Sequence, residues 1–172
     1  STAPTAPTLS GPGAPTTVNA DNFTITGTAE NGSTVEIFVD SNNDGTPDSQ
    51  VPVGSQQVIQ GTNFSIAVGL TQNAANHFLV RATDEAGNAS THTDVPTITE
   101  DSTAPAAPNL TSPSAPTTVN ADNFTITGTA ENGSTVEIFV DSNNDGTPDS
   151  QTPVGNQQLV QGTSFSIAVS LT

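Results

Sequence analysis

The chain of 172 residues contains no cysteine, lysine, tryptophan, tyrosine or methionine. Without cysteine it can form neither a disulfide nor a thiolate metal site. Without lysine it can form no Schiff base and no lysine isopeptide cross-link, and it has no basic patch for nucleic acid. Arg81 is the only basic residue apart from His77 and His92. These absences exclude nucleic acid as a partner and several kinds of covalent catalysis.

Catalysis in general finds little support in the sequence. No GxSxG nucleophile elbow is present, and neither histidine has a cysteine nucleophile to activate. His77 begins an expected strand and His92 lies in a polar, edge-like segment, so we expect both at the surface. The chain is therefore not expected to be an enzyme.

Acidic residues dominate the charge. Seventeen aspartates and glutamates against one arginine give a formal net charge of −16. This charge repels anionic membranes and polynucleotides. No segment is apolar and long enough to span a membrane and no signal peptide is present, so we expect no direct membrane insertion and an internal piece of a longer protein. The composition fits a salty, calcium-rich extracellular setting.

Apolar residues make up only 31 % of the chain, which borders on the disordered class. They are concentrated in short β-branched runs, such as Phe23–Thr26 and Phe64–Val68. Runs of this kind predict strands rather than a disordered chain. We therefore expect folded β-domains with thin cores that need help from bound ions.

The sequence repeats itself with a period of 101 residues. Residues 1–71 align with residues 102–172 and differ at eleven of the 71 positions, while Ala14–Gln50 recurs unchanged as Ala115–Gln151. A period of this length suits a whole domain better than a short solenoid repeat. We expect a complete domain at residues 1–101 and a second, incomplete one at residues 102–172.

Within one period, seven strand signals follow one another at short spacing and no helical period appears. An Asn-Gly turn at Asn31-Gly32 marks a hairpin. This pattern predicts an all-β fold of tandem immunoglobulin-like Greek-key sandwiches. The expected strands lie near Thr8–Val18 (interrupted at Gly11–Gly13), Phe23–Thr28, Thr34–Val39, Gln56–Gln60, Asn63–Leu70, His77–Thr83 and Thr91–Ile98.

An acidic segment, Asp40–Asp48, follows the third expected strand and recurs as Asp141–Asp149. Oxygen-bearing side chains occupy its positions 1, 3, 5 and 9, and a glycine occupies position 6. This spacing wraps a loop around one hard cation, and the all-oxygen donor set favours Ca²⁺ over Mg²⁺ or Zn²⁺. The expected ligands are Asp40, Asn42, Asp44, Thr46 (through its carbonyl) and Asp48, with Asp141, Asn143, Asp145, Thr147 and Asp149 in the second copy.

The match to an EF-hand is incomplete. Position 12, where an EF-hand has a bidentate glutamate, holds Val51 in one copy and Thr152 in the other, and no helices flank the loop. The pattern resembles the DxNxDGxxD calcium loops found on β-scaffolds. Water or a remote carboxylate, with Asp21 and Asp122 as candidates, could supply the missing ligands. The alternative is a solvated acidic turn that binds nothing in particular.

Three segments are similar to bacterial immunoglobulin-like repeats: Gly27–Val35 (GTAENGSTV), Val80–Ser90 (VRATDEAGNAS) and Asp101–Pro108 (DSTAPAAP). Such repeats form the extender region of large RTX-type, biofilm-associated surface adhesins. The resemblance implies a calcium-stabilised spacer, located outside the cell on the bacterial surface, that holds a distal binding domain away from the cell. Its partners would be the neighbouring repeats of the same chain.

Two alternatives to the spacer remain open. One is an immunoglobulin-like subunit of an extracellular filament joined by strand donation, and the other is a ligand-binding or accessory module of a secreted protein. The second repeat lacks the equivalents of residues 72–101, which leaves the strand Thr135–Val140 without its expected partner. An open edge of this kind predicts self-association through β-strand addition.

A second metal position is expected at the junction between repeats. The strand directions of a seven-stranded sandwich bring the second and sixth loops to one end of the domain. This arrangement pairs Glu30 with Asp84 in the first copy, and it brings Glu131 towards Asp101 of the linker. The proline-rich stretch Ala104–Pro108 favours an extended polyproline conformation, so we expect a stiff and metal-linked joint.

Overall fold

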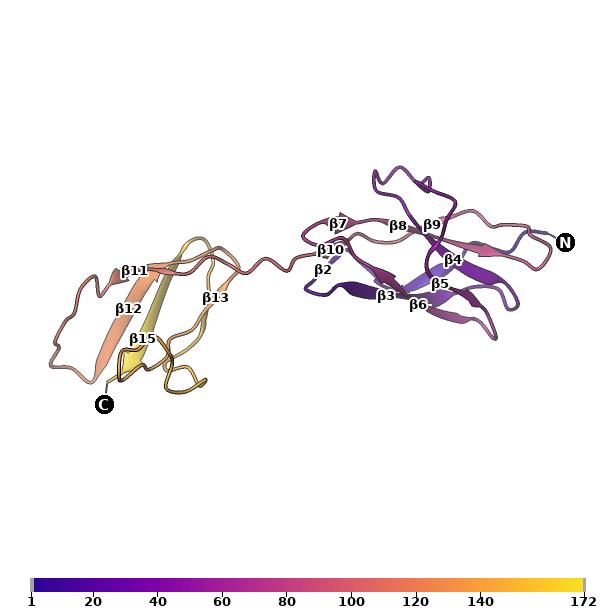
Figure 1. The fold of residues 1–172 in the computed structure, drawn as a ribbon. Coiled ribbons are helices and arrows are strands. Elements are labelled where there is room, and N and C mark those ends of the chain that lie inside the picture. The colour runs from indigo at the N-terminus through magenta and orange to yellow at the C-terminus, as the bar shows by residue number, and fades with distance from the viewer. Residues whose placement is uncertain (1, 172) are drawn as a thin grey trace. The chain divides into compact units, whose positions relative to one another are not determined.

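A computed structural model describes residues 2–171, and all regular elements in this range are β-strands (Figure 1). The chain divides into two compact units, Ser1–Thr103 and Ala104–Thr172. Ser102 and Thr103 thus belong with the first unit, two residues beyond the boundary expected from the repeat. No helix in the described part of the chain is long and apolar enough to cross a membrane.

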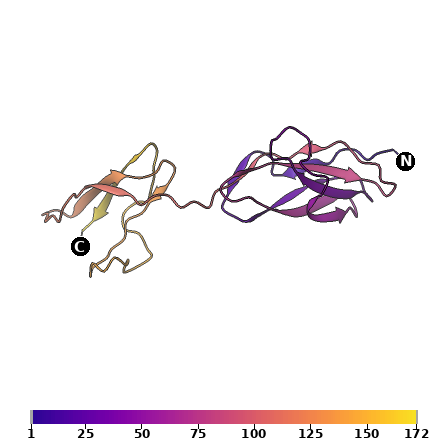
Figure 2. The ribbon, with the colours of Figure 1, turned by 45° about the horizontal axis from the view of Figure 1, so that its top comes forward.

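The first unit contains ten strands in three sheets, with sheet orders β1-β3-β6, β5-β4-β8-β9 and β2-β10-β7. The two larger sheets, β1-β3-β6 and β5-β4-β8-β9, form the layers visible in Figures 1 and 2. The ten strands are β1 (Thr8–Gly11), β2 (Thr16–Val18), β3 (Asn22–Thr28), β4 (Thr34–Val39), β5 (Val53–Val58), β6 (Asn63–Gly69), β7 (Ala75–Asn76), β8 (Phe78–Thr83), β9 (Thr93–Asp94) and β10 (Ile98–Glu100).

All seven expected strands are present, and two of them are divided. The first is broken at residues 12–15, where Pro12 and Pro15 lack backbone donors. Its first half, β1, pairs antiparallel with β3, and its second half, β2, pairs parallel with β10. The seventh expected strand likewise splits into β9 and β10, whereas the sixth is present as β8 and a separate short strand, β7, precedes it. The third sheet, which collects the second half of the first strand with β7 and β10, was not predicted.

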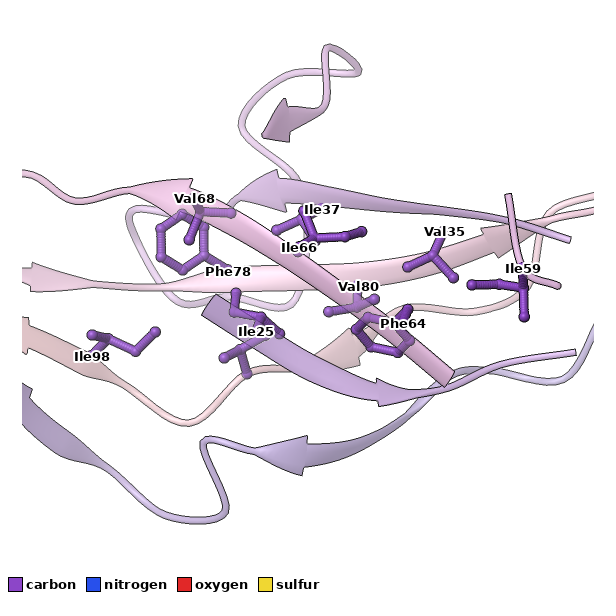
Figure 3. Packing of buried hydrophobic residues seen from close by; sticks show 11 residues of the cluster. Ile25, Val35, Ile37, Ile59, Phe64, Ile66, Val68, Phe78, Val80 and Ile98 are labelled. Atoms are coloured by element: carbon purple, nitrogen blue, oxygen red, sulfur yellow. The ribbon is translucent and has the colours of Figure 1, made fainter. Parts of the chain in front are cut away.

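The core lies between the two larger sheets (Figure 3). Alternation along β3 and β6 points Ile25, Phe64, Ile66 and Val68 inward and leaves their threonine and serine neighbours exposed. From the opposite layer, strands β4 and β8 contribute further buried side chains, namely Val35, Ile37, Phe78 and Val80. The two sheets therefore bury one apolar face each.

The second unit has the sheet order β11-β12-β15 and a separate pair, β13-β14. Its main sheet repeats the β1-β3-β6 register residue for residue. Its own small core includes Val136, Val160, Phe165 and Ile167. The strands are β11 (Asn109–Ser112), β12 (Asn123–Thr129), β13 (Thr135–Val136), β14 (Gln158–Leu159) and β15 (Ser164–Ser170).

Candidate metal-binding loops

The acidic segment forms the loop between β4 and β5, drawn in purple beside β8 and β9 in Figure 1. The N–H of Asp48 donates to the carbonyl of Val39 (2.9 Å) and closes the base of the loop. Asn43 and Gly45 adopt left-handed backbone conformations, with φ of 54° and 82°. Glycine and asparagine tolerate this region best, so the sequence suits the sharp turn that the spacing predicted.

Asp40, the first residue of the loop, is 1 % exposed. Its Oδ1 accepts a hydrogen bond from the N–H of Asp44 (3.1 Å), and its Oδ2 accepts one from the N–H of Gly45 (2.9 Å). These two bonds hold the turn against the end of β4. The buried Asp40 carboxylate therefore stabilises the turn through both of its oxygens.

The other acidic side chains of the loop also bond within it. Asp44 accepts from the amide Nδ2 of Asn42 (2.9 Å) and from the N–H of Thr46 (2.8 Å). Asp48 accepts from the N–H of Ser41 (3.0 Å). Hydrogen bonds from the side chain and backbone of Ser41 hold the pKa of Asp48 below its usual 3.8. The five predicted ligand residues thus lie in a single hydrogen-bonded turn.

The second copy of the loop has the same internal geometry. Asp141 accepts from the N–H groups of Asp145 (3.2 Å) and Gly146 (2.9 Å), and Asp149 accepts from the N–H of Ser142 (3.0 Å). Asn143 and Thr147 donate to Asp145 (2.9 and 2.8 Å), and these bonds, led by the one from Thr147, lower the pKa of Asp145. The loop conformation is therefore set by its own residues.

The donor chemistry of both loops fits calcium, although the side chains do not yet form a coordination shell. Among residues 2–171, no group of three or more histidine, cysteine, aspartate or glutamate side chains is arranged to hold a metal ion. The carboxylates point to backbone N–H groups, and Asn42 presents its Nδ2 rather than its Oδ1 to Asp44. Each carboxylate has about four acceptor sites, so these bonds leave oxygen lone pairs for a cation.

The residues predicted to meet at one end of the first unit do so. Glu30 and Asp84 line one open hollow of about 620 Å³, together with Glu85. Asp84 is fixed by the N–H of Asn88 (2.8 Å) and the N–H of Ala86 (3.0 Å). The topology predicted that these two turns meet, and both carboxylates line the same hollow.

The other two predicted junction residues lie in different units. Asp101 belongs to the first unit, where its Oδ1 accepts from the N–H of Thr103 (3.2 Å). Glu131 belongs to the second, where its Oε2 accepts from the N–H of Ala106 (3.4 Å). Asp21, considered as a remote ligand, accepts instead from the side chain of Gln72 (3.0 Å).

Sequence reasoning did not find a cluster on the outer face of the β4-β8 pair. Phe38 points away from the main core yet is 0 % exposed. The Arg81 guanidinium lies 4.7 Å from the Phe38 ring centroid and also pairs with Glu36 at 2.9 Å. The His92 ring meets the edge of Phe38 at 5.9 Å. The only available signal was the unbroken apolar run Ile37-Phe38-Val39, which departs from strict alternation.

Residues 3–98 match the family model described as the bacterial Ig domain. The chain belongs to this family. The match runs from before β1 to the first residue of β10, includes the acidic loop, and confirms the predicted immunoglobulin-like fold. Bacterial Ig domains are typically structural modules without enzymatic activity, and they commonly occur in surface or extracellular proteins. No curated protein matches the chain.

Proposed function

We propose that this bacterial Ig-domain chain is a calcium-stabilised extender segment of a cell-surface adhesin, which holds a distal binding domain away from the cell. The observation that carries the proposal is the identical folding of the two acidic loops in two repeats of nearly identical sequence. Near-identity of the repeats favours a role in setting the length of the protein, because recognition of different ligands by each unit would favour divergence of their sequences. A family of structural surface modules supports the same role.

The loop residues named above would hold the ion through their side-chain oxygens and the carbonyl of the residue at position 7. Binding requires Asn42 and Asn143 to present Oδ1, since both now direct Nδ2 to an aspartate. The ion would offset two of the three carboxylate charges in each loop, in a chain whose net charge is −16. Because no bidentate glutamate closes the loop, we expect a Kd on the order of 10⁻⁴–10⁻³ M, as in extracellular modules.

The first prediction concerns this binding. Calcium titration followed by calorimetry should show binding at two loop sites per chain for the wild type. Asp44→Ala and Asp145→Ala together should abolish both, because each removes a central carboxylate. Glu137→Gln is the matched control, since it removes one negative charge outside the loops and should keep both sites. Equal heats for the wild type and the double variant would reject the loops as the calcium site.

We also propose that the hollow lined by Glu30 and Asp84, at one end of the first unit, binds a second cation. The meeting of the two turns around this hollow supports the proposal. The same titration separates it from the loops. Heat that persists in the loop double variant and disappears on adding Glu30→Gln and Asp84→Asn would assign a site to this end.

A further inference from the structure

The turn between β6 and β7 carries an asparagine in an uncommon conformation. Asn73 has a φ of 52°, in the left-handed region that non-glycine residues rarely adopt. Its backbone N–H donates to Oε2 of Glu100 at 2.6 Å. Glu100 is 1 % exposed and lies at the end of β10, so the turn is held by a hydrogen bond to a buried carboxylate.

The side chain of Asn73 extends from this turn to the residues that leave the sandwich. Its Oδ1 accepts from the N–H of Ser102 (3.0 Å) and from Oγ1 of Thr103 (2.7 Å), with a longer contact from Oγ of Ser102 (3.4 Å). Oγ of Ser102 also donates to Oε2 of Glu100 (3.4 Å). Two residues beyond the last strand are therefore bonded to a turn some 30 positions earlier in the chain.

Backbone bonds continue up to the same point. The N–H of Glu100 donates to the carbonyl of Ala74 (2.9 Å), and the N–H of Asp101 donates to the carbonyl of Val18 (2.9 Å). At Ser102 the backbone N–H turns to the side chain of Asn73, and at Thr103 the hydroxyl does so while the backbone N–H donates to Asp101. This explains why the first compact unit ends at Thr103 rather than at the last strand residue, Glu100.

We propose that Asn73 is the anchor of the interdomain linker. It fastens Ser102 and Thr103 to the first sandwich, so that backbone freedom of the connecting segment begins only at Ala104. Asparagine suits this role because it tolerates the left-handed turn and carries an acceptor oxygen on a short side chain. The anchor uses no metal ligand of the loops, so it operates with or without calcium and stands apart from the proposed spacer function.

The test measures backbone order in the whole 172-residue chain. ¹⁵N relaxation should give order parameters near about 0.85 for Ser102 and Thr103 in the wild type, the value of rigid backbone. Asn73→Gly keeps the left-handed turn without strain and removes the acceptor, and these two amides should then fall below about 0.6. Thr103→Val removes one donor on the linker side and should cause a smaller loss at the same residues.

Asn31→Gly is the matched control. Asn31 also accepts from a distant backbone N–H, that of Gly61 at 2.8 Å, but through a turn that has no bond to Ser102 or Thr103. This variant should leave the two linker amides ordered. The proposal is overturned if Ser102 and Thr103 have low order in the wild type, or if Asn73→Gly leaves their order unchanged. Running each measurement in calcium and in EDTA keeps the result independent of the loops.

Discussion

Arg81 carries the single permanent positive charge of the chain and stabilises the outer face of the β4-β8 pair. Its guanidinium pairs with Glu36, which also accepts from Thr83 (3.1 Å), and it stacks over Phe38. Cation–π contacts of this kind contribute about 0.5–2 kcal/mol. The Arg81 side chain thereby covers Phe38, which lies outside the main core of a chain that has few apolar residues.

His92 lies at the rim of the same stack and gives a prediction about pH. Its Nε2 is buried and has no hydrogen-bond partner among the described residues. Burial, followed by the charge of Arg81, holds the pKa of His92 below its usual 6.5, while Asp94 acts in the opposite direction and Glu36 faces the stack through Arg81. An imidazole that stays neutral in the folded state binds fewer protons there than in the unfolded chain.

The free energy of unfolding of the first unit should therefore be at its full value above pH 6.5, fall as the pH drops from 6.5 towards the lower folded-state pKa, and level off below that pKa. Titration of the His92 ring protons by NMR should give a midpoint below 6.5. In denaturant melts at pH 7.5 and 5.5, His92→Gln should lessen the pH dependence. A His92 midpoint at or above 6.5 would contradict the prediction.

At the scale of elements, β5 covers the open edge of β6. The side-chain oxygen of Gln57 accepts from the N–H of Ser65 (2.8 Å). Further along, Gly54 passes so close to the carbonyl of Ala67 that a Cβ would lie 2.5 Å from its oxygen. The second unit repeats both contacts through Gln158 and Gly155. Covered edges resist pairing with strands of other molecules, so this crossing protects the sheet.

Gly54→Ala should disrupt this crossing. The new Cβ meets a backbone oxygen that cannot move aside, and φ at this position is 71°, so the variant incurs both a clash and left-handed strain. We expect the first unit to lose more than about 2 kcal/mol in urea melts. Gly61→Ala is the control, because φ is 102° there but nothing lies within 4 Å. Equal losses in the two variants would show that the close approach to Ala67 is unimportant.

Strand prediction succeeded where alternation was clear and missed where a strand changes sheets. β3, β4 and β6 lie within one residue of their expected bounds, because β3 and β6 alternate between a more buried and a more exposed face and β4 is a short apolar, β-branched run. The strand near Gln56–Gln60 is displaced to Val53–Val58, since the polar run Ser55–Gln57 has no apolar face to fix its register. The division between β9 and β10 depends on contacts with other strands, which no local pattern encodes.

At the scale of the whole molecule, the proposed ions should matter for stability. A domain with a thin core and no cysteine has a small free energy of unfolding. A ligand that binds only the native state raises this free energy by roughly 2.7 kcal/mol at a hundredfold excess over Kd. Because about 1 kcal/mol shifts a domain of this size by 4–8 °C, EDTA should lower the melting temperature by about 10 °C or more. The chain with Asp44→Ala and Asp145→Ala should melt low in either condition. An EDTA-insensitive wild-type transition would contradict calcium stabilisation.

The two copies of one sequence separate what the sequence determines from what the tertiary structure decides. Ala14–Gln50 and Ala115–Gln151 are identical, and their acidic loops share most of their hydrogen bonds, including those that the first and last aspartates accept. The shared bonds join residues at most nine positions apart, so local sequence suffices for the shape of the turn. The same is true of the Asn-Gly turns, in which Gly32 and Gly133 have φ of 85° and 87°.

The strand before each loop behaves differently. It runs for six residues as β4, which pairs with β8, and for only two as β13, which pairs with β14 alone. Phe38 is accordingly fully buried, whereas Phe139 is half-buried, and Asp40 is buried whereas Asp141 is partly exposed. A strand satisfies its backbone groups only through a neighbour far away in the sequence. The residues of the loop therefore determine its shape, while strand length, outer-face burial and the linker anchor are decided by tertiary pairing.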